Sequence, residues 1–262
     1  FRNTINREII MLGMTGKIGS VVLCGGLLFP SLASSQARPQ ALPTPVDKIF
    51  VVEGFDDNDK SEVVLHGDFR NSCNRLAESG AVIDAENKTI EVWSTYYEYP
   101  AGQENTMCAM VMIPFIEVVD LGILDQGEYN VTLKGSPEIQ ETLTIAKRKT
   151  ESPDDYLYAP VTNGWVETSE NGRQAVVVQG TFPLWFMGCQ IMTDVQVQTQ
   201  NEAIVVQPIT EIVDDERCDD ENYKHEFNVK KGISAPLKTE GLLHIRTLNS
   251  HAINRFVPAP VM

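Results

Sequence analysis

Short stretches of alternating apolar and polar residues recur along the chain and predict β-strands. Val195, Val197 and Thr199 alternate with glutamines, the period-two pattern of a strand with one face in water. The stretches expected to form strands are residues 48–53, 63–69, 89–99, 107–121 as two strands broken at Pro114, 127–131, 143–145, 161–168, 173–182, 191–200, 203–209, 226–230 and 242–248. A short helical turn is expected at residues 74–80. Long helical periodicity is absent, so the pattern predicts an all-β fold.

The hydrophobic pattern occurs twice along the sequence. Residues 63–69 lead to Cys73, and the similar residues 176–182 lead to Cys189. The anchors that follow in both copies are Asn87 and Asn201, Cys108 and Cys218, Phe115 and Phe227, and Gly127 and Gly241. Internal similarity at a nearly constant offset indicates tandem domains of one fold. We therefore expect one β-sandwich domain at residues 47–150, a linker at 151–155 and a second domain at 156–262.

Residues 1–37 have the pattern of a secretory signal peptide with some upstream residues. Lys17 precedes an apolar run at residues 18–32, and Ser35-Gln36-Ala37 places small residues before a cleavage site. A membrane anchor is the alternative, but the run is shorter than the roughly twenty apolar residues of a spanning helix. Residues 38–46 contain several prolines and are expected to form an extended leader.

The cysteines support export. Of the five cysteines, Cys24 lies in the apolar run and the other four occur two per repeat at equivalent places. This distribution predicts one disulfide per domain, Cys73 with Cys108 and Cys189 with Cys218. A zinc site is the alternative, although no Cys-x-x-Cys pair is present. We expect a periplasmic or extracellular protein with no membrane span after signal cleavage.

The formal net charge of −15 limits the choice of partners. Nucleic acid and anionic membrane surfaces repel so acidic a chain. A protein or glycan of the cell envelope remains as the expected partner. The basic cluster at residues 147–149 reads as a solvated linker edge.

Residues 125–131 read Asp-Gln-Gly-Glu-Tyr-Asn-Val, which resembles the tyrosine corner of immunoglobulin-like sandwiches. The strand pattern of each repeat resembles the immunoglobulin-like and fibronectin-type-III-like β-sandwich modules of secreted bacterial proteins. This resemblance implies two tandem immunoglobulin-like sandwiches.

Two departures from the antibody pattern are visible. Val131 stands where antibody-type domains place a cysteine, and Cys73 and Cys108 are too close in sequence for the usual bridge between sheets. Each disulfide is therefore expected to hold a loop or a strand edge. In the second repeat, Leu243 stands where Tyr129 stands in the first.

Catalytic motifs are missing. The sequence contains no Gly-x-Ser-x-Gly elbow, no His-Glu-x-x-His pair and no phosphate-binding glycine loop. His66 and His244 are expected on exposed strand faces, and His225-Glu226 is the one adjacent acid and base pair. We expect neither enzyme activity nor a cofactor.

Two loops are candidate binding sites. Carboxylates flank Cys218 and are either a calcium site or a solvated acidic loop; the weak candidate ligands are Asp214, Asp215, Asp219 and Asp220. The loop after Phe182 is longer and more apolar than its counterpart in the first repeat, and its binding candidates are Leu184, Trp185, Phe186 and Met187. This apolar loop either contacts a partner or covers its own domain.

Two classes of function stay open. The first is an exported non-catalytic module that binds a partner or serves as a structural spacer, since sandwich loops vary freely on a rigid frame. The second is a secreted hydrolase, or the accessory domains of one, with an active site that no motif marks. The missing motifs favour the first class.

Overall fold

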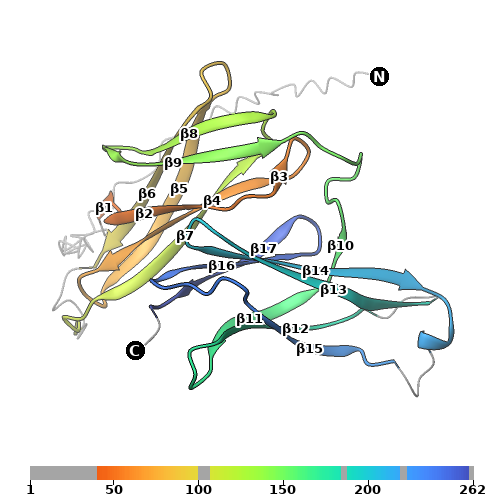
Figure 1. Cartoon of the computed structure of the whole chain (residues 1–262). Coiled ribbons are helices and arrows are strands. Elements are labelled where there is room, and N and C mark those ends of the chain that lie inside the picture. Colours follow the sequence, from red (N-terminus) through yellow and green to blue (C-terminus); the bar gives the residue numbers. More distant parts are fainter. Residues whose placement is uncertain (1–39, 100–106, 184–187, 219–222, 260–262) are drawn as a thin grey trace, which may run out of the picture. The chain divides into compact units, whose positions relative to one another are not determined.

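The computed structural model describes residues 40–99, 107–183, 188–218 and 223–259, and Pro39–Met262 form one compact unit. The structure is mostly strand (Figure 1). Among the described residues, no helix is long and apolar enough to cross a membrane. The all-β prediction is confirmed.

The first repeat folds into two sheets. The larger sheet has the strand order β1 (Gln40–Pro43), β6 (Thr89–Glu98), β8 (Gly127–Leu133), β9 (Ser136–Ala146) and β3 (Phe55–Asp56), with β5 (Asn74–Asp84) on the other side of β6. The smaller sheet has the order β2 (Val46–Val51), β4 (Ser61–Phe69) and β7 (Ile113–Gly122). Both sheets contribute residues to one buried apolar cluster, as in a β-sandwich.

The second repeat has the same plan. Its larger sheet has the order β10 (Leu157–Tyr158), β14 (Ala203–Val213), β16 (Gly241–Thr247) and β17 (His251–Val257), with β13 (Cys189–Gln200) also paired to β14. Its smaller sheet has the order β11 (Val161–Thr168), β12 (Gln174–Thr181) and β15 (Glu226–Gly232). A short 3₁₀ helix, η1 (Glu216–Cys218), follows β14.

Apart from β3, each strand of the first repeat has a counterpart in the second. A parallel pair occupies the same place in both larger sheets, β6 with β8 in the first repeat and β14 with β16 in the second. The first repeat has a further parallel pair, β3 with β9. The paired phenylalanines of the sequence repeat also meet in space. The ring centroids of Phe69 and Phe115 are 4.5 Å apart, and those of Phe182 and Phe227 are 4.7 Å apart.

Two local predictions in the first repeat are wrong. The expected helical turn at residues 74–80 is the start of β5. Residues 107–121 contain one strand rather than two, because residues 107–112 have no regular secondary structure and β7 begins at Ile113 and runs through Pro114. Proline is tolerated there because β7 is at the edge of its three-stranded sheet. Sequence patterns also missed four strands, β1, β3, β10 and β17.

The tyrosine corner is present in the first repeat. The hydroxyl of Tyr129 donates a hydrogen bond to the carbonyl oxygen of Asp125 at 3.0 Å. Lys88 Nζ donates to the same hydroxyl at 2.9 Å and lies 4.4 Å from the ring centroid. A buried phenol needs a partner for its hydroxyl, and these contacts hold the turn before β8 in place.

Candidate functional site

Both predicted disulfides are present, at corresponding places in the two repeats. Cys73 follows β4 and joins Cys108, which precedes β7. Cys189 opens β13 and joins Cys218 at the end of η1. As expected, each disulfide holds a loop near the end of a strand.

The segment after Cys108 exposes its apolar side chains to solvent. The exposed fraction is 92% for Met107, 81% for Met110 and 62% for Met112, and Val111 between them is exposed as well. Methionine is among the residues most often buried, so three exposed ones in a short segment are unusual. We call residues 107–112 the methionine segment.

Cys108 and Ala109 of the methionine segment are held in place. The backbone N–H of Ser72 donates to the carbonyl oxygen of Ala109 at 3.0 Å, and the N–H of Ala109 donates to Ser72 Oγ at 2.8 Å. Together with the Cys73–Cys108 disulfide, these bonds tie the segment to the turn between β4 and β5. A hollow of about 450 Å³ lies beside it, lined by Ser72, Cys73, Arg75, Tyr99 and Met107.

The sequence pattern predicts a strand from residue 107 and so gives no sign that these methionines are exposed. The difference between the two copies of the repeat does mark the methionine segment. Between the second cysteine and the repeated phenylalanine, the first copy reads Ala-Met-Val-Met-Ile-Pro and the second reads Asp-Asp-Glu-Asn-Tyr-Lys-His-Glu. The same place in the repeat is therefore apolar in one copy and acidic in the other.

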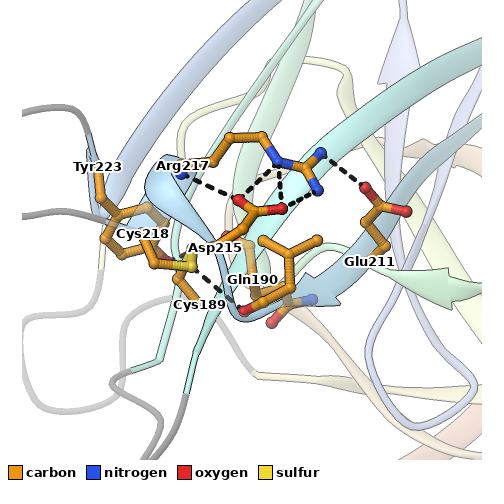
Figure 2. Close-up of a disulfide and its surroundings, with 8 residues drawn as sticks. Cys189, Gln190, Glu211, Asp215, Arg217, Cys218 and Tyr223 are labelled. Carbon is orange, nitrogen blue, oxygen red and sulfur yellow. Dashed lines mark hydrogen bonds and ion pairs between the residues drawn. A yellow bond between two sulfur atoms is a disulfide. The ribbon is translucent and has the colours of Figure 1, made fainter.

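In the acidic loop around Cys218, part of the negative charge is neutralised by Arg217 of the same loop (Figure 2). Arg217 donates to both carboxylate oxygens of Asp215, Nε to Oδ1 at 2.9 Å and Nη2 to Oδ2 at 2.7 Å, and Nη1 reaches Glu211 at 3.0 Å. These hydrogen bonds lower the pKa of Asp215 to about 2. Both oxygens of this candidate calcium ligand are thus occupied by an arginine.

The structure describes only one of the three other candidate calcium ligands. Asp214 is exposed, while Asp219 and Asp220 lie outside the described residues. In the part of the chain that the structure describes, no group of three or more His, Cys, Asp or Glu side chains could hold a metal ion. Calcium binding stays a prediction. The apolar loop formed by Leu184, Trp185, Phe186 and Met187 also lies outside the described residues.

A buried ion pair links the two repeats. Arg246 of β16 donates from Nη1 to Asp59 Oδ2 at 3.1 Å and from Nη2 to the carbonyl oxygen of Gly54 at 2.8 Å. Its guanidinium carbon lies 4.4 Å from the centroid of the Phe55 ring. The side chains of Arg246 and Asp59 are only 4% and 7% exposed.

A second buried polar group lies beside this ion pair. His244 Nδ1 is 2.9 Å from Asn254 Oδ1, and Asn254 Nδ2 donates to Glu62 Oε1 at 2.6 Å. The ring of His66 stacks on Phe256 with centroids 4.4 Å apart. Strands of the first repeat are therefore joined to strands of the second through side chains.

The prediction that His66 and His244 lie on exposed strand faces is wrong, because the exposed fractions are 5% and 0%. Both strand faces are covered by the neighbouring repeat. A solvent-borne substrate has no access to the His244 ring, although Glu62 is within 3.4 Å of it. His225 and Glu226 are both exposed, and the His225 ring packs edge-on against Tyr223.

The environment shifts the pKa values of two carboxyl groups at this junction in opposite directions. Burial raises the pKa of Glu62, but hydrogen bonds from His244 and Asn254 and the nearby charge of Arg246 outweigh it, so the pKa is lowered overall. Burial also raises the pKa of Asp59, and there Arg246 compensates only in part. The junction is a structural contact between the repeats.

Fold and site together define a disulfide-bonded, all-β protein built from β-sandwich sheets. Residues 63–145, from β4 to β9, match a family model described as the ORF11 beta-sandwich domain. The matched part covers less than half of the chain and lies wholly within the first repeat. No curated protein and no solved structure matches the chain.

Proposed function

We propose that this protein is an exported, non-catalytic binding module made of two tandem immunoglobulin-like domains, residues 47–150 and 156–262. Its binding surface is the methionine segment, and its partner is a protein of the cell envelope. The observation that carries the proposal is the exposure of Met107, Met110 and Met112 on a segment held by a disulfide. Methionine is enriched at protein interfaces because its flexible thioether side chain adapts to different surfaces.

Export is part of the proposal. Two disulfides suit an oxidising compartment such as the periplasm or the extracellular space. The sequence pattern at residues 18–37 supports a signal peptide, with cleavage before Arg38. Intact-mass measurement of the exported protein tests this, and a mature species that retains Cys24 would contradict it.

The binding surface is tested by capturing partners from a cell-envelope extract with the full chain as bait. We compare the parent protein with a variant carrying Met107→Ser and Met110→Ser. The matched control is Ile123→Ser, which removes another exposed apolar side chain of the first repeat. We expect the double variant alone to lose a partner that the parent captures, with the free energy of unfolding unchanged.

The apolar loop at residues 184–187 is the alternative surface. A variant carrying Trp185→Ser and Phe186→Ser is used as bait in the same capture experiment. Loss of the partner in this variant, but not in the Met107 and Met110 double variant, would move the binding surface to the second repeat. Loss of several kcal/mol of stability would instead show that the loop residues are internal.

A further inference from the structure

Three exposed methionines lie within the six residues of the methionine segment, and the chemistry of their thioether sulfurs selects a particular ligand. We propose that Met107, Met110 and Met112 bind one copper(I) ion. The inference rests on the proposed function in that it uses the same exposed segment, and it replaces a general apolar contact with a defined set of ligand atoms.

The spacing of the three residues permits a shared ion. Fully extended, the chain from Met107 to Met112 spans at most about 18 Å. Residues 107–112 have no regular secondary structure, so ladder hydrogen bonds do not fix the directions of these side chains. Methionine has three rotatable bonds before its methyl group, which lets sulfurs at this spacing turn toward one point.

The segment also has a fixed base, which reduces the cost of ordering it around an ion. Cys108 lies between Met107 and Met110 and is bonded to Cys73. Ala109, the next residue, is held by its two hydrogen bonds to Ser72. Only the side chains and a few backbone angles remain to be ordered when the ion binds.

The ligand type favours copper(I) over other cations. Thioether sulfur is a soft, uncharged ligand that prefers soft ions such as copper(I), whereas calcium and magnesium prefer oxygen. Thiolates would compete for the ion in a reducing compartment. Here all four cysteines after residue 37 are in disulfides, so the thioethers are the soft sulfur ligands that remain.

The surroundings are compatible with a single positive charge. Arg75 is the cation that lines the same hollow, and its Nη1 donates to the carbonyl oxygens of Ser72 at 2.8 Å and Asn74 at 2.7 Å. Its guanidinium is therefore directed at the backbone. The net charge of −15 attracts cations to the chain as a whole.

The test titrates the exported protein, which begins at Arg38 and so lacks Cys24, with copper(I) against the chromophoric competitor bicinchoninate. The copper(I) is supplied anaerobically as its acetonitrile complex without a thiol reductant. We expect one tightly bound copper(I) per chain. The variant Met107→Leu, Met110→Leu and Met112→Leu should lose this complex, because leucine keeps the apolar volume and removes the sulfur. The control Met192→Leu, on β13, should bind like the parent. Absence of a one-to-one complex, or an unchanged complex in the triple leucine variant, would overturn the proposal.

Two further readouts distinguish thioether ligands from other donors. X-ray absorption at the copper edge should show sulfur neighbours alone, and a thiol assay should confirm that the disulfides are intact. Silver(I), a stable substitute, should shift the methyl signals of three methionines equally at pH 7 and pH 5, because thioethers carry no proton to lose. Loss of binding at pH 5 would point to histidine and overturn the proposal.

The leucine variant also separates this inference from the proposed function. If it loses copper(I) but still captures the partner protein, the thioethers bind the ion and the apolar surface binds the partner. If the parent captures the partner and binds no copper(I), the proposed function stands and the copper site is wrong. If copper(I) binds and the serine variant captures the partner as the parent does, the proposed protein contact is wrong instead.

Discussion

Arg246 and Arg217 each bind an aspartate at hydrogen-bonding distance, but the two pairs lie in different surroundings. The Arg246–Asp59 pair is almost fully buried, whereas the side chains of Arg217 and Asp215 are about half exposed. Water screens an exposed pair and hydrates either partner when the other is removed. A buried pair has no such compensation, so removing one partner leaves an isolated charge in the interior.

Replacing Arg246 with methionine should therefore destabilise the protein strongly. The expected loss is about 3 to 5 kcal/mol of unfolding free energy, the usual cost of leaving one buried charge unpaired. Urea denaturation measures it. The matched control is Arg217→Met, which should leave stability nearly unchanged. Similar losses in the two variants would contradict the burial argument.

Glu62 should make stability depend on pH. Its pKa is lowered from the usual 4.5 in the folded protein, so its ionised form is favoured by folding. This contribution is fully present above pH 4.5 and is lost as the pH falls through the lower folded pKa. The Glu62→Gln variant should thus be less stable than the parent at pH 7, by a difference that shrinks below pH 4.5.

Stability curves from pH 7 to pH 3 check this prediction. Asp59 has the opposite shift, so the comparison is made between variant and parent rather than on the parent curve alone. Glu240→Gln replaces an exposed glutamate and is the matched control. A difference between the Glu62 variant and the parent that stays constant with pH would show that the ionised form makes no special contribution.

At the scale of single elements, a glycine in the second strand of each smaller sheet makes room for its neighbours. A Cβ atom added to Gly180 in β12 would clash with the carbonyl oxygen of Pro160 and with the ring of Phe227. One added to Gly67 in β4 would clash with the equivalent groups of Pro45 and Phe115. Glycine usually weakens a strand, so its use here reflects close packing.

Gly180→Ala should consequently cost about 1 to 3 kcal/mol, the usual cost of overpacking a core. Gly232→Ala is the matched control in the neighbouring strand β15, where an added Cβ meets nothing within 4 Å. That change should be neutral or slightly stabilising, since alanine restricts the unfolded chain more than glycine does. Thermal unfolding compares the two. Equal effects would refute the packing argument.

At the scale of the whole molecule, the two repeats share part of one core. Ala203, Val205 and Leu242 of the second repeat belong to the same buried apolar cluster as the core of the first. The Arg246–Asp59 pair adds a buried polar contact between them. Such coupling makes it costly to unfold one repeat while the other stays folded.

We therefore expect residues 39–262 to unfold in one cooperative transition, with equal calorimetric and van't Hoff enthalpies. Replacing Cys189 and Cys218 with serine should lower the stability of this single transition by roughly 3 to 4 kcal/mol, the chain-entropy value for a loop of this size. The double replacement of Cys73 and Cys108 is its counterpart in the first repeat. Two separate transitions, with only one shifted by either replacement, would show that the repeats fold independently.

Much of the fold could be predicted because its signals are local in sequence. Strand positions follow from alternation of apolar residues, and the cysteine pairs follow from the repeat. The tyrosine corner was readable because its hydrogen bond joins Tyr129 to Asp125, four residues away. Predictions for residues 74–80 and 107–112 were wrong because propensity and proline position do not say which neighbouring strand is present to pair with.

The sequence by itself determined the β-strand content, the repeated frame and the disulfide pairing, since each depends on residue type and order. Only the tertiary structure decided which polar side chains are buried. His66, His244 and Asp59 lie in or beside strands that expose one face in an isolated sandwich, and in each case the other repeat covers that face. Burial depends on what packs against a strand, and that partner is distant in sequence. The exposure of the methionine segment was decided in the same way, because no described strand covers it.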